Sequence, residues 1–293
     1  MILMTGATGT LGRPLLQRLL GAGEQVRCLV REPRRLGPSR VQVQISLGNL
    51  ADTTGLDRTL RGVDTVIHLA ATTRDQPRGT IEELNGLATL RLLNAAKRAG
   101  ARRFVYVSSF NASQSSASRF IRMQALAAEA VKQSTLEAVI FEAGIIYAPD
   151  DPWIKLMSEL ARLPVMPVIG RGRAAFQPIW AEDAADAITA TLLKDIATPG
   201  APIALAGPDR LNQNQILKIV MRHFGAQKPL LHLPTGPARK MLDWQEQRFG
   251  QATLATWDQV ALLQDSILSP RGTGDLSVLG VEPLPMADVL PAR

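Results

Sequence analysis

The sequence contains little cysteine, histidine and tyrosine, and each shortage removes a class of site. Cys28 is the only cysteine among the 293 residues, so an intrachain disulfide is impossible. The three histidines lie far apart along the chain without the spacing of zinc ligands, and we expect no metal site. The only tyrosines are Tyr106 and Tyr147. Chemistry that depends on a tyrosine as proton donor is therefore restricted to two positions.

Long apolar runs are also missing. No stretch of about 18 consecutive apolar residues occurs, so we expect no transmembrane helix. The first residues lack the charged, apolar and small-residue pattern of a secretory signal, which favours a cytoplasmic location. With 46% hydrophobic and 20% charged residues, the composition is that of a globular protein long enough to bury a sizeable core.

Positive charge is concentrated in the first half of the chain. Residues 1–150 contain 19 Lys/Arg and 12 Asp/Glu, whereas residues 151–293 contain 14 of each. This excess fits either a solvated, arginine-rich surface or an anionic partner, such as a cofactor phosphate or a membrane surface. No continuous basic block with interleaved aromatic residues occurs, so we expect no nucleic-acid binding.

The most informative motif follows the apolar run Met1–Met4 and consists of Gly6-Ala7-Thr8-Gly9-Thr10-Leu11-Gly12. Together with the amphipathic run after it, this segment is typical of a strand, a tight turn and a helix. Gly6 permits the turn, Gly9 allows the backbone to approach a pyrophosphate, and Gly12 allows the helix to pack closely on the sheet. The helix N-terminus offers free N–H groups and a positive dipole end to phosphates. The segment therefore predicts a dinucleotide site.

Strand and helix patterns alternate through the first 150 residues. The predicted strands cover residues 1–4, 25–30, 41–45, 65–70, 103–107 and 138–142, and the main predicted helices cover residues 84–97 and 120–132. This alternation predicts an α/β protein with a doubly wound parallel sheet, a Rossmann fold, covered by helices on both faces.

After residue 147 the alternation stops, which predicts a smaller, partly helical C-terminal lobe. We expect a nucleotide-binding domain over residues 1–147 and a substrate or partner lobe over residues 148–293, interleaved with the first domain around residues 174–206. Further helices are predicted at residues 153–162, 181–193 and 211–224, the last one started by Asn212.

The amphipathic stretch at residues 257–268 is expected to pack against its own chain. Docking of this stretch on a protein partner or peripheral contact with a membrane surface stays open. Trp180, Trp244 and Trp257 are expected to fill the core of the second lobe.

Further motifs make the chain resemble the atypical short-chain dehydrogenase/reductase superfamily over nearly its full length. They are Gly48-Asn49-Leu50, the strands at residues 64–71 and 104–109, Asn85 to Thr89, residues 143–147 and residues 176–180. The chain is most similar to the NmrA-type proteins and the NADPH-holding accessory subunit of respiratory complex I, which are related to nucleoside-diphosphate-sugar epimerases. Besides the glycine turn, the resemblance implies cofactor contacts by Arg31, Asn49, Leu50, Leu69, Ala70, Ala71, Val107, Ser108, Gln124, Ala143, Gly144 and Ile145.

The residue at the end of the second strand favours NADP(H) over NAD(H). NAD-preferring sites place Asp or Glu there to bond the ribose 2′-hydroxyl. This chain has Arg31, whose guanidinium can bind a 2′-phosphate at two points. Asn49 replaces the aspartate that the family usually carries, and its amide oxygen can still accept a hydrogen bond from adenine.

The catalytic position departs from the family pattern. Active members use a Tyr-x-x-x-Lys pair, whose spacing puts both side chains on one face of a helix. The resemblance places Phe120 at the tyrosine and Gln124 at the lysine, so neither the proton nor the charge is present. Ser109 matches the family's catalytic serine or threonine, but serine alone is a poor acid. Glu142 stands where relatives usually have arginine, and we expect an exposed or arginine-paired acid there.

Two functions stay open. In the first, the acid–base step is lost and NADP(H) is held as a structural or sensing ligand, with Gln124 bonding its ribose and Phe120 packing on the nicotinamide. The protein then has a cofactor-holding, sensing or assembly role. In the second, it is an NADPH-dependent oxidoreductase, or an epimerase-like enzyme, on a small carbonyl or sugar-derived substrate. Its proton donor would be Tyr147, His68 or Arg122, or the substrate itself, although His68 is expected to be a hydrogen-bonded core residue.

Overall fold

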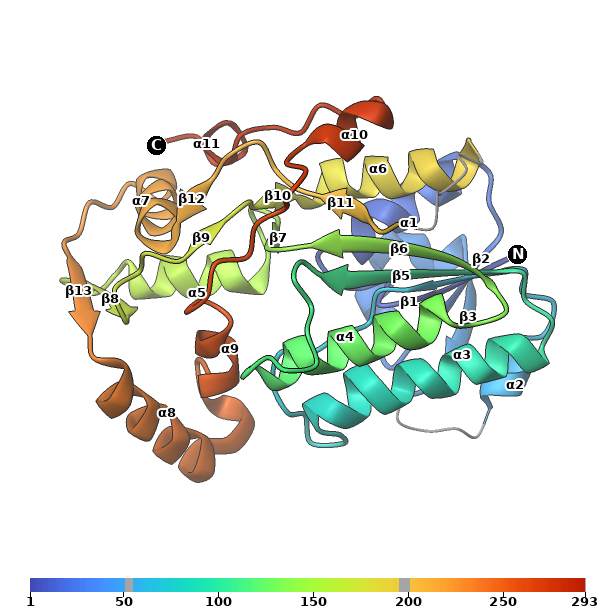
Figure 1. The fold of residues 1–293 in the computed structure, drawn as a ribbon, viewed down its shortest axis with the longest axis horizontal. Helices are drawn as coiled ribbons and strands as arrows, with labels where there is room; N and C mark the ends of the chain where they lie inside the picture. The colour runs from blue at the N-terminus through green and yellow to red at the C-terminus, as the bar shows by residue number, and fades with distance from the viewer. Residues whose placement is uncertain (51–54, 195–200, 293) are drawn as a thin grey trace.

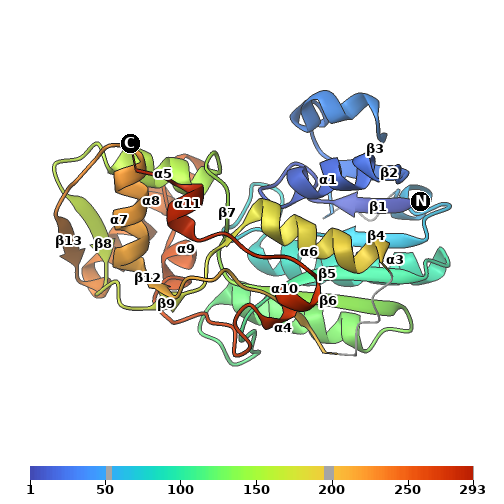
Figure 2. The same cartoon turned by 90° about the horizontal axis from the view of Figure 1, so that it is seen from above.

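The computed structural model describes residues 1–50, 55–194 and 201–292 and has two lobes (Figure 1). The larger lobe contains a central sheet flanked by helices. The smaller lobe lies beyond the carboxyl ends of the sheet strands, as Figures 1 and 2 both show. None of the helices in the described ranges has both the length and the apolar character that a membrane span requires.

Seven parallel strands form the central sheet, in the order β11-β6-β5-β4-β1-β2-β3. Their bounds are β1 (Ile2–Thr5), β2 (Val26–Val30), β3 (Gln44–Leu47), β4 (Thr65–His68), β5 (Arg103–Ser109), β6 (Glu137–Ala143) and β11 (Ile203–Leu205). β1 and β4 are buried along their whole length, because helices cover both faces of the sheet. The strand order reverses between β1 and β4, and ligands of such folds bind beyond the carboxyl ends of the strands at this reversal.

Helices cover the two faces of the sheet (Figure 2). They are α1 (Gly12–Gly21) and α6 (Ala181–Leu193) on one face, and α2 (Leu56–Thr59), the π-helical η2 (Glu82–Leu87), α3 (Ala88–Arg98) and α4 (Arg119–Lys132) on the other. On the first face, Leu15 of α1 and Ile188 of α6 are fully buried. On the second, Leu92 of α3 and Val131 of α4 join the core that contains Phe104 of β5. These apolar stripes hold the helices on the sheet.

The second lobe combines short strand pairs with helices around a core of its own. The strand pairs are β7 (Ile146–Tyr147) with β10 (Ile179–Trp180), β8 (Met166–Ile169) with β13 (Leu230–Leu233), and β9 (Ala175–Phe176) with β12 (Leu211–Asn212). The helices are α5 (Pro152–Leu160), α7 (Gln213–His223), α8 (Thr235–Phe249), η3 (Gly250–Ala252), α9 (Trp257–Ala261) and α11 (Met286–Val289). Ile154, Phe176 and Ile216 are fully buried in this core or nearly so.

The second half of the chain contributes to both lobes. α6 and β11 belong to the sheet lobe, and so does α10 (Gly274–Val278), whose Leu276 joins the same core as Leu15 of α1. Arg18 of α1 reinforces the packing of α6 through ion pairs with Glu182 at 2.6 Å and Asp186 at 2.5 Å.

The α/β class and the Rossmann arrangement agree with the sequence prediction, and most differences concern element bounds. All six strands expected before residue 150 are present, but the third begins at Gln44 rather than at Val41. The predicted start of α7 is confirmed, since Asn212 and Gln215 exchange side-chain-to-backbone hydrogen bonds in a capping box. Of the amphipathic stretch at residues 257–268, the part Trp257–Ala261 forms the helix α9, and α8 was not predicted.

Candidate functional site

The glycine turn lies at the carboxyl end of β1 and leaves no room for side chains at two of its glycines. Gly6 has a φ of +74°, and a Cβ there would lie 2.7 Å from the Ala70 nitrogen. A Cβ on Gly12 would lie 2.0 Å from the Gly6 carbonyl oxygen. The Gly9 nitrogen donates to that same oxygen at 2.9 Å. The turn is therefore packed against the end of β4, and only glycine fits at Gly6 and Gly12.

A cleft of about 320 Å³ opens beside this turn, at the reversal between β1 and β4. Its volume lies within the range of small-molecule pockets, about 300–1,000 Å³. Nine residues predicted to bind the cofactor line it: Gly6, Thr8, Gly9, Arg31, Asn49, Leu50, Leu69, Ala70 and Ala71. The lining also includes Leu29, Val30, Arg35, Gly48, Thr72, Gln76 and Leu84.

The other predicted cofactor residues do not line the cleft. Four of them belong to the turn or the start of α1, namely Ala7, Leu11 and Gly12, which are buried, and Thr10, which is half-buried. The remaining six come from β5, α4 and the end of β6: Val107, Ser108, Gln124, Ala143, Gly144 and Ile145. The cleft therefore covers the part of the predicted site nearest to β1, β2 and β4.

Two arginines form one end of the cleft. Arg31 follows β2, and Arg35 lies in the short helix η1 (Pro33–Val41); both are exposed. The sequence predicted Arg31 as a cofactor residue and did not predict Arg35, although Arg35 lies only four residues after Arg31. Two guanidinium groups at one rim form a site of positive charge that suits a phosphate.

Asn85 of η2 holds the opposite wall of the cleft in place. Its Oδ1 accepts a hydrogen bond from the Thr72 nitrogen at 2.9 Å, and its Nδ2 donates to the Thr72 carbonyl at 2.9 Å. Nδ2 also donates to the Ile81 carbonyl at 2.8 Å. Asn85 is 2% exposed, so these bonds satisfy its amide away from water. Sequence reasoning found Asn85 in a family motif but did not predict this positioning role.

His68, at the end of β4, is a core residue with both ring nitrogens hydrogen-bonded. Thr89 Oγ1 donates to the Asn85 carbonyl at 2.7 Å and so accepts from His68 Nε2 at 2.9 Å. Thr5 Oγ1 then donates to His68 Nδ1 at 2.6 Å. Burial lowers the pKa of His68 to about 4. The ring is therefore held neutral, as expected for a structural histidine.

The helix α4 brings the predicted catalytic positions next to β5. Phe120 is partly exposed, whereas Gln124 is buried at 3%. The Tyr106 hydroxyl donates a short hydrogen bond to Gln124 Oε1. This bond uses the amide oxygen of Gln124 and leaves the Nε2 group as its donor. Burial raises the pKa of Tyr106, so its hydroxyl stays protonated.

The other candidate proton donors are not at the cleft. Tyr147 is fully buried in the core of the second lobe, and its hydroxyl has no hydrogen-bond partner among the described residues. Burial raises its pKa, and nearby carboxylates act in the same direction. Arg122 donates to the Ser116 carbonyl at 2.7 Å. Ser109 is buried at the end of β5. Tyr147 is therefore enclosed in the core of the second lobe rather than exposed at the cleft.

Glu142 is half-buried on β6, in register with Ser108 of β5 and Ala204 of β11. Burial raises its pKa, while the positive charge of Arg271 acts in the opposite direction. Arg271 forms an ion pair with Asp275 at 2.8 Å. The carboxylate of Glu142 thus lies near the positive charge of Arg271, close to the edge strand β11.

Arg119, at the start of α4, joins three carboxylates from three segments. Its guanidinium contacts Glu82 at 2.6 Å, Asp75 at 3.1 Å and Asp258 of α9 at 3.0 Å. This arrangement lowers the pKa of Glu82 to about 2, mainly through the hydrogen bonds from Arg119. Gln259 of α9 also donates to Thr73 Oγ1 at 3.3 Å. These contacts attach the second lobe to the loop that follows the cleft residue Thr72.

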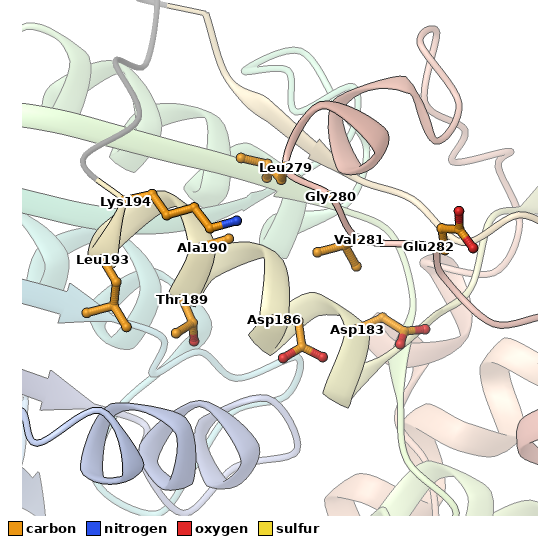
Figure 3. A pocket seen from close by; sticks show the side chains of 10 residues that line it. All are labelled: Asp183, Asp186, Thr189, Ala190, Leu193, Lys194, Leu279, Gly280, Val281 and Glu282. Atoms are coloured by element: carbon orange, nitrogen blue, oxygen red, sulfur yellow. The ribbon is translucent and has the colours of Figure 1, made fainter.

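A second depression, of about 440 Å³, lies on the outer side of α6 (Figure 3). Its wall includes Asp183 and Asp186 of α6 and the segment at residues 279–282. Asp186 already pairs with Arg18, and Asp183 accepts a hydrogen bond from the Leu284 nitrogen at 2.9 Å. These acids have structural partners, so the cleft at the glycine turn is the better candidate site.

Comparison with known proteins agrees with this geometry. Residues 6–157, which contain the glycine turn and the cleft, match the family described as NAD(P)H-binding. The chain belongs to this NAD(P)H-binding family of atypical short-chain dehydrogenases/reductases. The match includes all the residues of the cleft.

Two relatives and one solved structure show what the chain is similar to. The chain is 30% identical over 248 residues to the mitochondrial NADH dehydrogenase [ubiquinone] 1 alpha subcomplex subunit 9 of Arabidopsis thaliana, covering 80% of this chain but only 61% of that protein. It is 30% identical over 239 residues to the ceramide reductase of Caulobacter vibrioides, covering 80% and 73%. The fold is similar to that of the NADPH-dependent quinone oxidoreductase QOR2 of Escherichia coli, with a TM-score of 0.75, 18% identity and 99% and 98% coverage.

Proposed function

We propose that this protein holds NADP(H) in a sensing, accessory or assembly role and does not perform the proton transfer of a standard short-chain dehydrogenase. The observation that carries this proposal is the pair on α4. Phe120 and Gln124 occupy the positions at which the resemblance expects tyrosine and lysine. The amide oxygen of Gln124 is engaged by the Tyr106 hydroxyl. Neither the side chain of Phe120 nor that of Gln124 carries a transferable proton or a charge that would activate one.

The remaining titratable groups support this reading. The imidazole of His68 is neutral and hydrogen-bonded at both nitrogens. The Tyr147 hydroxyl is enclosed in the other lobe. Ser109 can orient a carbonyl but is a weak acid without an activating partner.

The cleft residues fit a phosphorylated dinucleotide. Gly9 leaves the backbone open to a pyrophosphate, and Ala70 and Ala71 keep the wall beneath a ribose small. Arg31 and Arg35 would hold the 2′-phosphate, which NAD(H) lacks. Glu32 does not line the cleft, and none of the described residues that line it carries a carboxylate. This chemistry favours NADP(H).

An accessory role is also consistent with the similarity to the Arabidopsis subunit, whose name places it within a larger NADH dehydrogenase. A second candidate is an NADPH-dependent reductase, because the ceramide reductase of Caulobacter vibrioides is equally similar. Bound NADPH supplies a hydride. In this second candidate the proton would come from water or the substrate, with Ser109 orienting the acceptor.

The test is calorimetric titration with NADPH and with NADH. Hydrogen bonds to charged groups contribute about 1.5–3 kcal/mol, reduced at exposed sites. We therefore expect Arg31→Ala and Arg35→Ala each to weaken NADPH binding by about 5- to 30-fold and to leave NADH binding nearly unchanged. Arg34→Ala is the matched control, since Arg34 is exposed on the same segment but does not line the cleft.

Each result has a clear meaning. Absence of affinity for either cofactor overturns the proposal. Equal affinity for both, unaffected by Arg31→Ala, overturns the NADP(H) preference alone. Oxidation of NADPH by a ketone, enone or quinone, slowed by Ser109→Ala, would favour the reductase over the cofactor-holding role.

A further inference from the structure

The outer face of α8 exposes a stripe that combines apolar and basic side chains. Met241, Trp244 and Arg248 follow one another at intervals of three and four residues, and Lys240 lies four residues before Trp244, so all four share one side of the helix. All four are exposed, Met241 by 46% and Trp244 by 59%. We call these four residues the α8 stripe. Trp244 was expected in the core of the second lobe, and that prediction is wrong.

The opposite side of α8 faces the protein. Ala238 and Leu242 are buried. Asp243 and Glu246 are half-buried on the flanks, and Asp243 pairs with Arg239 at 3.7 Å. The acids of α8 thus lie on its flanks, outside the α8 stripe, which carries two positive charges and no negative one.

The apolar surface continues past the end of α8. Phe249 is 54% exposed and Leu254 is 71% exposed. The ring of Phe249 packs edge-on against Trp244, with 6.1 Å between ring centroids, and Arg248 lies over Phe249 at 5.7 Å. Figure 1 shows α8 at the lower left edge of the second lobe, away from the central sheet. A projecting helix therefore presents aromatic and basic groups together.

We propose that the α8 stripe docks on the surface of an anionic lipid bilayer. A helix lying in the membrane plane buries its apolar face among the headgroups, while lysine and arginine reach the lipid phosphates. Lys240 and Arg248 flank Met241 and Trp244 in this way. The positive excess of the chain lies in residues 1–150, so it is the charge of Lys240 and Arg248 beside the apolar residues that attracts this face to such a surface. The stripe is a convex helix face with two cations beside its apolar centre, which favours a phosphate-covered surface over a groove in a protein partner.

The experiment is flotation of the purified full chain with vesicles of phosphatidylcholine, with and without phosphatidylglycerol. We expect binding to the anionic vesicles, weakened by salt because exposed charges are screened. Tryptophan emission should shift to shorter wavelength on binding, and Trp244→Phe should remove most of that shift. Weak or absent binding to the neutral vesicles is expected.

Two double variants separate the electrostatic and the apolar contributions to vesicle binding. Lys240→Gln/Arg248→Gln should lower affinity for anionic vesicles by about 25-fold, about fivefold for each base. Met241→Ser/Trp244→Ser should lower it at least about tenfold through lost apolar burial. The matched control Lys132→Gln/Lys155→Gln removes two exposed bases elsewhere and should change affinity by less than about threefold.

Retained NADPH binding, or an unchanged unfolding curve, verifies that each variant is folded. The proposal is overturned if the wild-type chain ignores anionic vesicles, or if the stripe and control variants lose affinity equally. Self-association or capture of a protein through the stripe, without lipid binding, would also overturn it and assign the surface to a protein partner.

Discussion

Acid is expected to destabilise this protein through His68. The pKa of His68 is about 4 in the folded protein, against 6.5 for an exposed histidine, because the ring is buried and neutral. Between these values the unfolded chain binds a proton that the folded protein excludes. The stability from the neutral ring is fully present above pH 6.5 and is lost as pH falls toward 4. A tenfold difference in proton affinity corresponds to about 1.4 kcal/mol, so the loss is about 3 kcal/mol.

Urea unfolding across this pH interval, compared between the wild-type chain and His68→Gln, measures the effect. Glutamine offers one acceptor toward Thr5 and one donor toward Thr89 but does not titrate in this range. The variant should therefore lose less stability on acidification, by up to about 3 kcal/mol. Val66→Ala is the control, because it truncates a fully buried residue of the same strand. It should lower stability by about 2 kcal/mol at every pH.

Identical pH dependence in the wild-type chain and His68→Gln would refute this reasoning. It would mean that the ring titrates normally in the folded protein, and His68 would again be a candidate proton donor.

Two further predictions concern the glycine turn and α4. Gly12→Ala should lower the free energy of unfolding in urea by about 3 kcal/mol, because its Cβ would overlap the Gly6 carbonyl. Gly21→Ala is the control and should be neutral or slightly stabilising, because there is open space around its Cβ. Equal effects of the two substitutions would contradict the geometry of the turn. Tyr106→Phe should cost about 1–3 kcal/mol by leaving the buried Gln124 oxygen without its donor, and adding Gln124→Leu should recover part of that loss. A single variant as stable as the wild-type chain would argue against the Tyr106–Gln124 bond.

Local features of the sequence were sufficient to predict the fold class and the end of the candidate site that lies at the glycine turn. The spacing of Gly6, Gly9 and Gly12 after an apolar strand predicts the turn, because strand, turn and helix are formed by neighbouring residues. The start of α7 at Asn212 is equally local, since a cap bonds residues within the same helical turn. β3 was misplaced because most of its residues are exposed, so hydrophobic alternation does not mark its start.

The assignment of α8 needed the tertiary structure. A tryptophan and a methionine at helical spacing usually belong to a core, and only the position of the helix within the lobe shows that Met241 and Trp244 face outward. Arg35 likewise became a cleft residue only because η1 brings it beside Arg31.

The sequence by itself determined the parallel sheet, the glycine turn and the arginine after the second strand. Through the resemblance it also predicted that Phe120 and Gln124 stand at the tyrosine and lysine positions. The tertiary structure decided that Asn85 holds the cleft wall and that Tyr106 engages Gln124. It also placed Tyr147 in the core of the second lobe. Propensities and motifs act over a few residues, whereas these contacts join residues separated by 13 or 18 positions or by the boundary between lobes. Such contacts form only when the helices pack on the sheet.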